Sequence, residues 1–201
     1  MSANISHGSV PSIRPVLITL DLALPGTLDD AAAPRVLFYP GSSIGNFTPV
    51  QALGFLRSVH AACGPAPGSG LLIGVDLVKD TAELEAAYDD ALGVTAAFNR
   101  NLLPHINRLA GTDFALADWR HVALFNTALS RIEMHLEAQR ALTVRWPGGV
   151  RAFATGERIH TENAYKWTMA GFETLLQDAG FHGARAWTDP QQRFAVYWAA
   201  R

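Results

Sequence analysis

Residues 35–77 read RVLFYPGSSIGNFTPVQALGFLRSVHAACGPAPGSGLLIGVDL and decide the fold. The apolar run at 35–39 ends at a Pro-Gly pair, and the run at 70–77 has no polar alternation, so both are expected to be buried strands. Between them, Thr48 and Pro49 predict the N-cap and the first residue of a helix that continues to Cys63. Strand, helix and strand at this spacing predict a parallel βαβ unit.

The pattern changes after Asp80, where apolar residues recur at helical spacing and predict one long helix. The residues of this stripe are Leu84, Tyr88, Leu92, Thr95, Phe98 and Leu102. Pro104 is expected to end or kink the helix. Residues 119–126 are ambiguous, whereas residues 131–146 alternate in part and predict a strand.

The end of the chain returns to short apolar segments. A Pro-Gly-Gly turn at 147–149 predicts a hairpin with residues 150–154. Thr168 predicts the N-cap of a helix that stops at Gly180. Residues 184–187 and 194–198 predict two closing strands.

The composition is that of a globular protein. Of 201 residues, 49% are apolar and 17% are charged, and the net charge is −2 without a basic face, which argues against a nucleic-acid partner. Cys63 is the only cysteine, so a disulfide framework is excluded and a cytoplasmic location is expected. The apolar run at 16–20 is too short for a membrane span and lacks signal-peptide features, and residues 1–15 are expected to form a flexible arm.

Two short motifs suggest chemistries that their surroundings do not support. Residues 41–45, GSSIG, match the nucleophile elbow of a serine hydrolase with Ser43 as nucleophile. The helix is expected to start near Pro49 rather than at the serine, so a glycine loop leaving a strand end is the favoured interpretation. His160 and Glu162 form an H-x-E without a following P-C-x-x-C, which argues against a zinc deaminase. The seven histidines lack metal-ligand spacing, so no metal site is predicted.

Four residues are candidates for ligand binding, each with a structural alternative. Asn46 follows the first strand, where α/β sheets bind ligands, but it also suits a turn. Tyr88 lies on the apolar stripe and is more simply a core aromatic. Glu162 could accept an imidazole N–H or lie on the surface near a helix start. Met134 is a core or pocket-wall residue.

Several segments together resemble one family. They are PGSSIGNF at 40–47, GVDLVKD at 74–80, AYDDALGVTAAFNRNLL at 87–103, RIEM at 131–134 and HTEN at 160–163. With them, the chain from residue 35 onward resembles the histidine Nα-methyltransferases of ergothioneine biosynthesis. These enzymes use S-adenosyl-L-methionine to place three methyl groups on the α-amino nitrogen of L-histidine, which gives Nα,Nα,Nα-trimethylhistidine (hercynine).

The resemblance implies an α/β, Rossmann-like methyltransferase fold with an inserted substrate-binding region. Residues 1–79 and 167–201 are expected to form the Rossmann-like part, and residues 80–166 the insertion. The reaction needs no covalent nucleophile, so no catalytic residue is assigned. By resemblance, substrate binding falls to Asn46 and Tyr88 at the amino-acid end and to Met134, Glu162, Asn163 and the position of Ala164 at the imidazole end.

Two departures from the family pattern change the expectation. Ala164 stands where the family has a serine that helps to hold the imidazole, which opens the choice of amine substrate. The family's glycine-rich loop and its acidic ribose-binding residue have no counterpart before residue 35. The fold is therefore expected to be N-terminally incomplete, with most of the cofactor site outside the chain. A split enzyme with a complementary N-terminal chain and a non-catalytic amino-acid-binding remnant are the alternatives.

Overall fold

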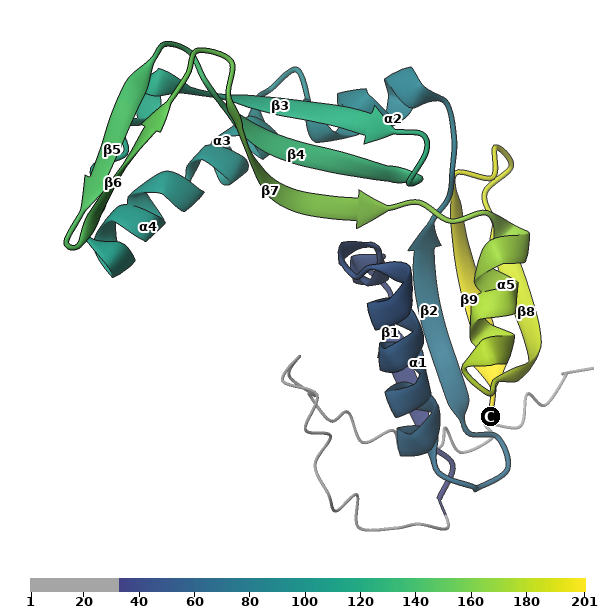
Figure 1. The fold of residues 1–201 in the computed structure, drawn as a ribbon. Coiled ribbons are helices and arrows are strands. Elements are labelled where there is room, and N and C mark those ends of the chain that lie inside the picture. Colours follow the sequence, from purple (N-terminus) through teal and green to yellow (C-terminus); the bar gives the residue numbers. More distant parts are fainter. Residues whose placement is uncertain (1–32) are drawn as a thin grey trace, which may run out of the picture.

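The computed structural model describes residues 33–201, and the predicted arm at 1–15 and the apolar run at 16–20 lie outside them. Figure 1 shows a sheet backed by two helices and, beyond its end, a second group of strands and helices. The elements are β1 (Val36–Tyr39), the 3-10 turn η1 (Ser43–Asn46), α1 (Pro49–Cys63), β2 (Gly70–Asp76), α2 (Thr81–Tyr88), α3 (Val94–Arg100), α4 (Leu102–Ala110), η2 (Leu116–Asp118), β3 (Trp119–Asn126), β4 (Arg131–Ala138), β5 (Leu142–Trp146), β6 (Gly149–Phe153), β7 (Arg158–Tyr165), α5 (Met169–Asp178), β8 (His182–Thr188) and β9 (Phe194–Ala200).

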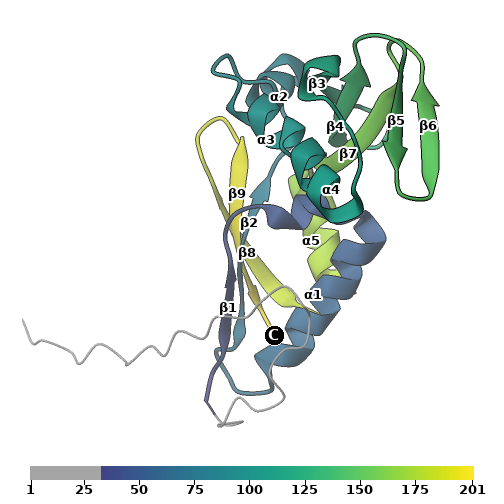
Figure 2. The ribbon, with the colours of Figure 1, turned by 90° about the vertical axis from the view of Figure 1, so that its left-hand side faces the viewer.

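The first sheet has the strand order β1-β2-β9-β8. β1 pairs with β2 in parallel, so the predicted βαβ unit is confirmed, and β9 runs antiparallel to both β2 and β8. Helices α1 and α5 lie on the same face of this sheet (Figures 1 and 2). Fully buried Leu56, Ile73, Phe172 and Tyr197 join the helices to the strands in one core.

The helix starts that were predicted on this sheet are confirmed. At α1, Thr48 and Gln51 form a capping box: the Thr48 hydroxyl accepts from the Gln51 backbone N–H at 3.3 Å, and the Thr48 N–H donates to the Gln51 side chain at 2.9 Å. At α5, the Thr168 side chain accepts from the Gly171 N–H. The two closing strands are β8 and β9, which confirms their prediction as well.

The single long helix predicted after Asp80 is wrong, because α2, α3 and α4 take its place. Gly93 adopts a left-handed conformation with φ 69°, and the Asp90 carboxylate accepts from the Val94 and Thr95 N–H groups, so the chain restarts a helix there. Leu92, expected on the buried stripe, is 91% exposed. Pro104 lies in the first turn of α4, where its missing N–H costs no hydrogen bond, so it does not end the helix.

The strands of the second part form a three-stranded sheet and a hairpin. The ambiguous residues at 119–126 are β3, and the sheet order is β3-β4-β7. The single strand predicted at 131–146 is wrong: it is divided into β4 and β5, because the Gln139 N–H leaves the ladder and donates to the Asp118 carbonyl. β5 pairs with β6, which confirms the hairpin. Among residues 33–201, no helix has both the length and the apolar character to cross a membrane.

β7 contains one extra residue relative to its neighbour. The register pairs Met134 with Glu162 and His135 with His160, so Thr161 has no partner across the strand. Its hydroxyl donates to the Met134 carbonyl at 2.9 Å and closes the bulge. Since successive residues of β4 face opposite sides, Glu162 lies on the face of Met134, and His160 lies on the opposite face with His135. Glu162 is thus a strand residue and does not lie near a helix start.

Candidate functional site

A pocket of about 340 Å³ opens at the carboxyl ends of the parallel strands β1 and β2. This is the edge at which α/β sheets bind ligands. Its walls come from the loop after β1, the ends of β2, α2 and β7, and the start of β9; the residues are Gly41, Ser42, Ser43, Gly45, Asn46, Asp76, Tyr88, Ala164, Tyr165, Lys166 and Phe194. The pocket therefore joins the first sheet to the β3-β4-β7 sheet.

The loop after β1 reaches the end of β7 because it contains a glycine. A Cβ atom on Gly45 would lie 2.8 Å from the backbone oxygen of Tyr165, a separation that side chains do not tolerate. Ser42 ties the other end of the loop, since its hydroxyl accepts from the Asp76 N–H at 2.8 Å. These two contacts place Asn46, which is exposed, on the same pocket wall as buried Ala164.

A buried lysine organises the floor of the pocket. The Lys166 side chain is only 2% exposed, and its ammonium donates to the Asp76 carboxylate at 2.6 Å and to the Tyr88 hydroxyl at 2.9 Å. The other oxygen of Asp76 accepts from Lys79 at 2.6 Å. One carboxylate thus faces two ammonium groups, which leaves the cluster with a net positive charge.

This charge favours an anionic ligand group next to Tyr88. Because the Tyr88 oxygen accepts from Lys166, its own O–H remains available to donate into the pocket. The Lys166 ammonium also lies 4.6 Å from the centre of the Tyr88 ring, which holds the ring in place by a cation–π contact. The floor can therefore bind a carboxylate with a neutral donor supported by a cation.

The structure brings most of the predicted substrate residues to one side of the β3-β4-β7 sheet. Asn46, Tyr88 and Ala164 line the pocket. Met134 is 3% exposed and packs with Ala164 and Tyr88 in one apolar cluster, and Glu162 lies opposite Met134 in the register.

Glu162 is the unpaired charge of this region. Burial raises the pKa of its carboxyl, and none of the hydrogen bonds within residues 33–201 ends on its carboxylate oxygens. Such a carboxylate is suited to a ligand N–H. Asn163 differs from the other predicted residues: it pairs with Glu133 on the opposite face, and its side-chain oxygen is buried without a partner in the described part of the chain.

Lys166 and Asp76 were given no role from the sequence, although Asp76 lies in a quoted segment. For Asp76 the signal is a charged residue at the end of the apolar run 70–75, whereas Lys166 follows the largely polar strand 158–165 and has no such signal. The hydrolase alternative gains no support from the pocket. Ser43 lines it, but no histidine occurs among the described residues that do so, so the serine has no imidazole base there.

A family model described as a histidine-specific, S-adenosylmethionine-dependent methyltransferase matches residues 9–201. The histidine N-alpha-methyltransferase of Mycolicibacterium smegmatis is 43% identical over 173 residues, which cover 83% of this chain and 52% of that protein. The protein of the same name from Mycobacterium tuberculosis is 42% identical over 170 residues, with the same two coverages of 83% and 52%.

A more distant relative carries the name of a different methyl acceptor. The 4-dimethylallyltryptophan N-methyltransferase of Aspergillus fumigatus is 29% identical over 194 residues, which cover 87% of this chain and 57% of that protein. The chain thus spans about half the length of the curated relatives it matches.

Proposed function

Because this chain belongs to the family of histidine-specific, S-adenosylmethionine-dependent methyltransferases, we propose that it supplies the substrate pocket of an enzyme that methylates the α-amino group of L-histidine. The observation that carries the proposal is the pocket at the ends of β1 and β2, where Asn46, Tyr88 and buried Lys166 converge. The volume of about 340 Å³ lies at the small end of the range for ligand sites and suits a single amino acid.

At the amino-acid end, the carboxylate of histidine binds the hydroxyl of Tyr88 and the amide NH2 of Asn46. Lys166 supplies the positive charge behind Tyr88 and makes its hydroxyl a better donor. The carbonyl oxygen of Asn46 accepts from the α-amine. Tyr88 and Asn46, on one side of the pocket, then fix the direction of the amine lone pair.

At the side-chain end, Glu162 accepts the N–H of the imidazole and Met134 forms the apolar wall beside the ring. Binding gives the Glu162 carboxylate the hydrogen bond that it lacks within residues 33–201. Asn163 stays a candidate substrate-binding residue, and its role would be to support β7, the strand that carries Glu162. Ala164 is 5% exposed and contributes no hydroxyl, so selectivity for the imidazole depends mainly on Glu162.

The chemistry asked of these residues is positioning. S-adenosylmethionine supplies an electrophilic methyl group when it is bound. Each transfer needs a neutral nitrogen, so the ammonium form of the substrate releases one proton to solvent before each of the three transfers. Two anchors that hold both ends of histidine immobilise this nitrogen without a covalent step.

We assign the cofactor to the Rossmann-like part, residues 1–79 and 167–201, and histidine mainly to the insertion at 80–166. We also propose that the residues in hand bind the cofactor weakly by themselves and that turnover depends on a complementary N-terminal chain. The corresponding N-terminal half of the Mycolicibacterium smegmatis relative is the natural test partner, since the match covers 52% of that protein.

Binding experiments separate the two ends of the pocket. Calorimetry on the 201-residue chain would compare L-histidine with L-phenylalanine, which lacks the imidazole, and with histidinol, which lacks the carboxylate. Tyr88→Phe should weaken both amino acids about tenfold and spare histidinol, because it removes the hydrogen bond to the ligand carboxylate. Glu162→Gln should weaken L-histidine and histidinol and spare L-phenylalanine, because it removes the charged acceptor of the imidazole N–H.

Tyr197→Phe is the matched control, because the Tyr197 hydroxyl donates to the Met169 carbonyl in the core and not into the pocket. If Glu162→Gln weakened the binding of L-histidine and L-phenylalanine equally, Glu162 would not be the residue that binds the imidazole. For turnover, mass spectrometry should find trimethylhistidine only when the N-terminal half of the relative is added. Turnover by the chain alone would show that its cofactor site is complete.

A further inference from the structure

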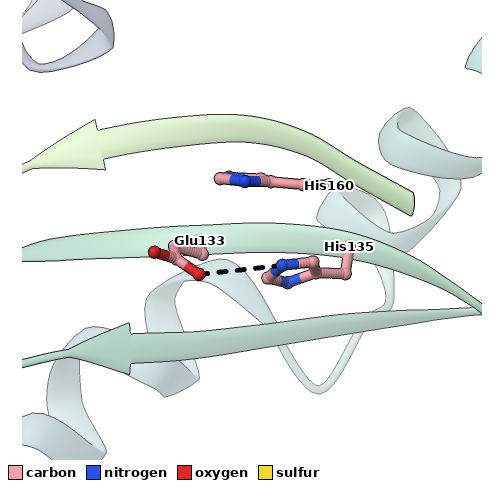
Figure 3. A group of neighbouring side chains, drawn as sticks. All are labelled: Glu133, His135 and His160. Atoms are coloured by element: carbon pink, nitrogen blue, oxygen red, sulfur yellow. Dashed lines mark ion pairs between the residues drawn. The ribbon is translucent and has the colours of Figure 1, made fainter. Parts of the chain in front are cut away.

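Two histidines and a glutamate meet on the face of the β3-β4-β7 sheet that points away from the pocket. Glu133 and His135 come from β4 and His160 from β7, and one ligand atom of each lies within 4.8 Å of the other two. Figure 3 shows the three side chains gathered over the two strands. The opposite face of the sheet carries Ile132 and Met134 in the apolar cluster, so this group belongs to neither the core nor the candidate substrate pocket.

One ring nitrogen of His160 is held by the backbone, and the ring lies stacked on that of His135, so it must rotate for both rings to bind one ion. Its Nε2–H donates to the backbone carbonyl of Glu162 at 3.1 Å, which leaves the lone pair of Nδ1 available. A backbone acceptor on one ring nitrogen fixes the tautomer of a metal-binding histidine and turns the other nitrogen toward the ion. The residue is exposed, so its ring can adjust without disturbing the core.

His135 is the buried member of the group. It is 8% exposed, and its ring stacks on that of His160 with centroids 4.7 Å apart. Its Nε2 lies 3.7 Å from the Glu133 carboxylate, which is longer than a hydrogen bond, and its buried Nδ1 has no partner among the described residues. The nitrogen that faces Glu133 is Nε2, and the 3.7 Å between them leaves room for an ion that both atoms could bind.

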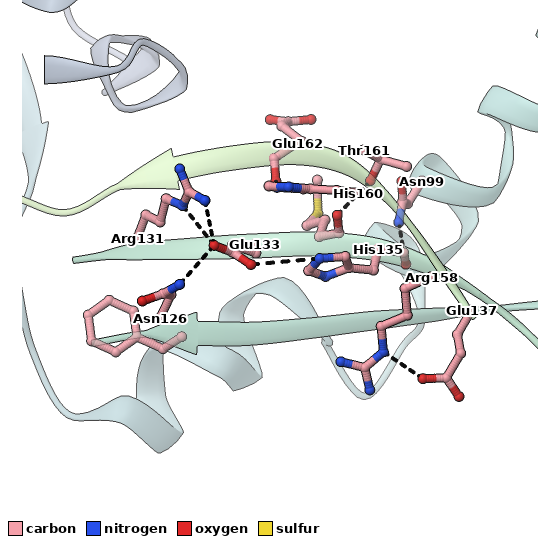
Figure 4. Close-up of polar contacts among 12 residues, drawn as sticks. Asn99, Asn126, Arg131, Glu133, His135, Glu137, Arg158, His160, Thr161 and Glu162 are labelled. Atoms are coloured by element: carbon pink, nitrogen blue, oxygen red, sulfur yellow. Dashed lines mark hydrogen bonds and ion pairs between the residues drawn. The ribbon is translucent and has the colours of Figure 1, made fainter. Parts of the chain in front are cut away.

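Glu133 offers one oxygen and is held by the other. Its Oε1 accepts from Arg131 at 2.6 and 2.8 Å and from Asn126 at 3.0 Å (Figure 4). The Oε2 atom faces His135. The guanidinium orients the carboxylate in the way that outer hydrogen bonds orient metal ligands. Its positive charge also opposes a cation, so we expect moderate rather than tight binding.

We propose that Glu133, His135 and His160 form a binding site for a divalent transition-metal ion such as Zn²⁺ or Ni²⁺. Two imidazoles and one carboxylate suit these ions, whereas Mg²⁺ and Ca²⁺ prefer oxygen ligands alone. Ligand bonds of about 2.0–2.2 Å require the three groups to move closer together, and exposed His160 supplies that movement. No metal site was predicted from the sequence, because His135 and His160 are 25 positions apart and only the pairing of β4 with β7 brings them together.

The test is metal binding by the untagged 201-residue chain after chelator treatment and dialysis. Calorimetry with ZnCl₂ and with NiSO₄ should show one saturable site that His160→Ala and Glu133→Gln each weaken at least tenfold. His105→Ala is the matched control, because His105 is an exposed histidine on α4, and it should leave the affinity unchanged. Circular dichroism would verify that each variant keeps its fold.

A spectroscopic measurement distinguishes this site from adventitious binding. Co²⁺ bound by the chain should give a visible d–d spectrum whose intensity His160→Ala changes and His105→Ala does not. The proposal fails if no ion saturates the chain. It also fails if His105→Ala and His160→Ala weaken binding equally, since the histidines would then act only as scattered surface ligands.

Discussion

At the scale of single residues, two charged side chains near the end of β7 differ in whether they have a partner. Lys166 is paired with Asp76, from which it is separated by 90 positions in sequence, whereas Glu162 has no partner within the described part of the chain. Sequence motifs identified Asn46, Tyr88 and Glu162 as candidates, because the family pattern marks them. They could not identify the Lys166–Asp76 pair, because it exists only after β2 and β7 are brought together by folding.

The pH dependence of stability should reveal the unpaired charge of Glu162. Burial raises the pKa of this carboxyl in the folded state, so folding favours its protonated form. Below the unfolded-state pKa, both states are protonated and the carboxyl does not affect stability. As the pH rises from the unfolded-state pKa through the folded-state pKa, ionisation of the buried carboxyl increasingly lowers the stability of the folded state. Glu162→Gln should therefore match the wild type in urea unfolding at acidic pH and exceed its stability near pH 8.

The control for this experiment is Asp89→Asn, which removes an exposed carboxyl. That variant should not show the same rise in relative stability between acidic and alkaline pH. A Glu162→Gln protein that is less stable than the wild type near pH 8 would mean that the carboxylate has a favourable partner, contrary to the structure. The same variant weakens histidine binding in our proposal, so the residue would exchange stability for recognition.

At the scale of elements, the βαβ unit and the capped helices followed from the sequence because their signals are local. Thr48 and Pro49 start α1, and Thr168 starts α5. The single helix predicted after Asp80 is wrong because the Asp90 side chain caps the next helix, and the apolar stripe from which the single helix was predicted does not include Asp90. The division of β4 from β5 depends on a contact with residue 118, which no local pattern contains.

Two glycines in neighbouring elements should respond oppositely to alanine. In α1, a Cβ on Gly54 meets nothing within 4 Å, so Gly54→Ala should stabilise the protein by about 1 kcal/mol through helix propensity. In η1, the Cβ of Gly45→Ala would meet the Tyr165 backbone oxygen at 2.8 Å and should cost roughly 1–3 kcal/mol. Urea unfolding measures both, and a neutral Gly45→Ala would show that η1 does not pack against β7 as closely as the structure indicates.

At the scale of the whole molecule, one face of the first sheet has no helix among the described residues. Val36, Phe38 and Trp187 are 57%, 66% and 46% exposed, and they point away from the face that α1 and α5 cover. β1 is also the edge strand of this sheet (Figure 2). Apolar side chains on an open edge favour association between molecules.

The chain should therefore self-associate in a way that depends on this face. The double variant Val36→Lys, Phe38→Lys should shift sedimentation toward the monomer and reduce the binding of a hydrophobic dye. Leu109→Lys is the control, since Leu109 is 74% exposed on α4 and lies in a different part of the molecule. A wild-type chain that sediments as a monomer at micromolar concentration would contradict this expectation.

The bulge at Thr161 has a consequence for how this protein can diverge. Substitution at this position leaves the strand register intact, but deletion of one residue would turn 158–160 over. His160 would then face the Met134 side, and Arg158 would leave the Glu137 carboxylate that it contacts at 2.7 Å. Among homologous sequences, insertions and deletions between residues 160 and 162 should accordingly be rarer than amino-acid replacements, because one backbone unit keeps two chemically different surfaces apart.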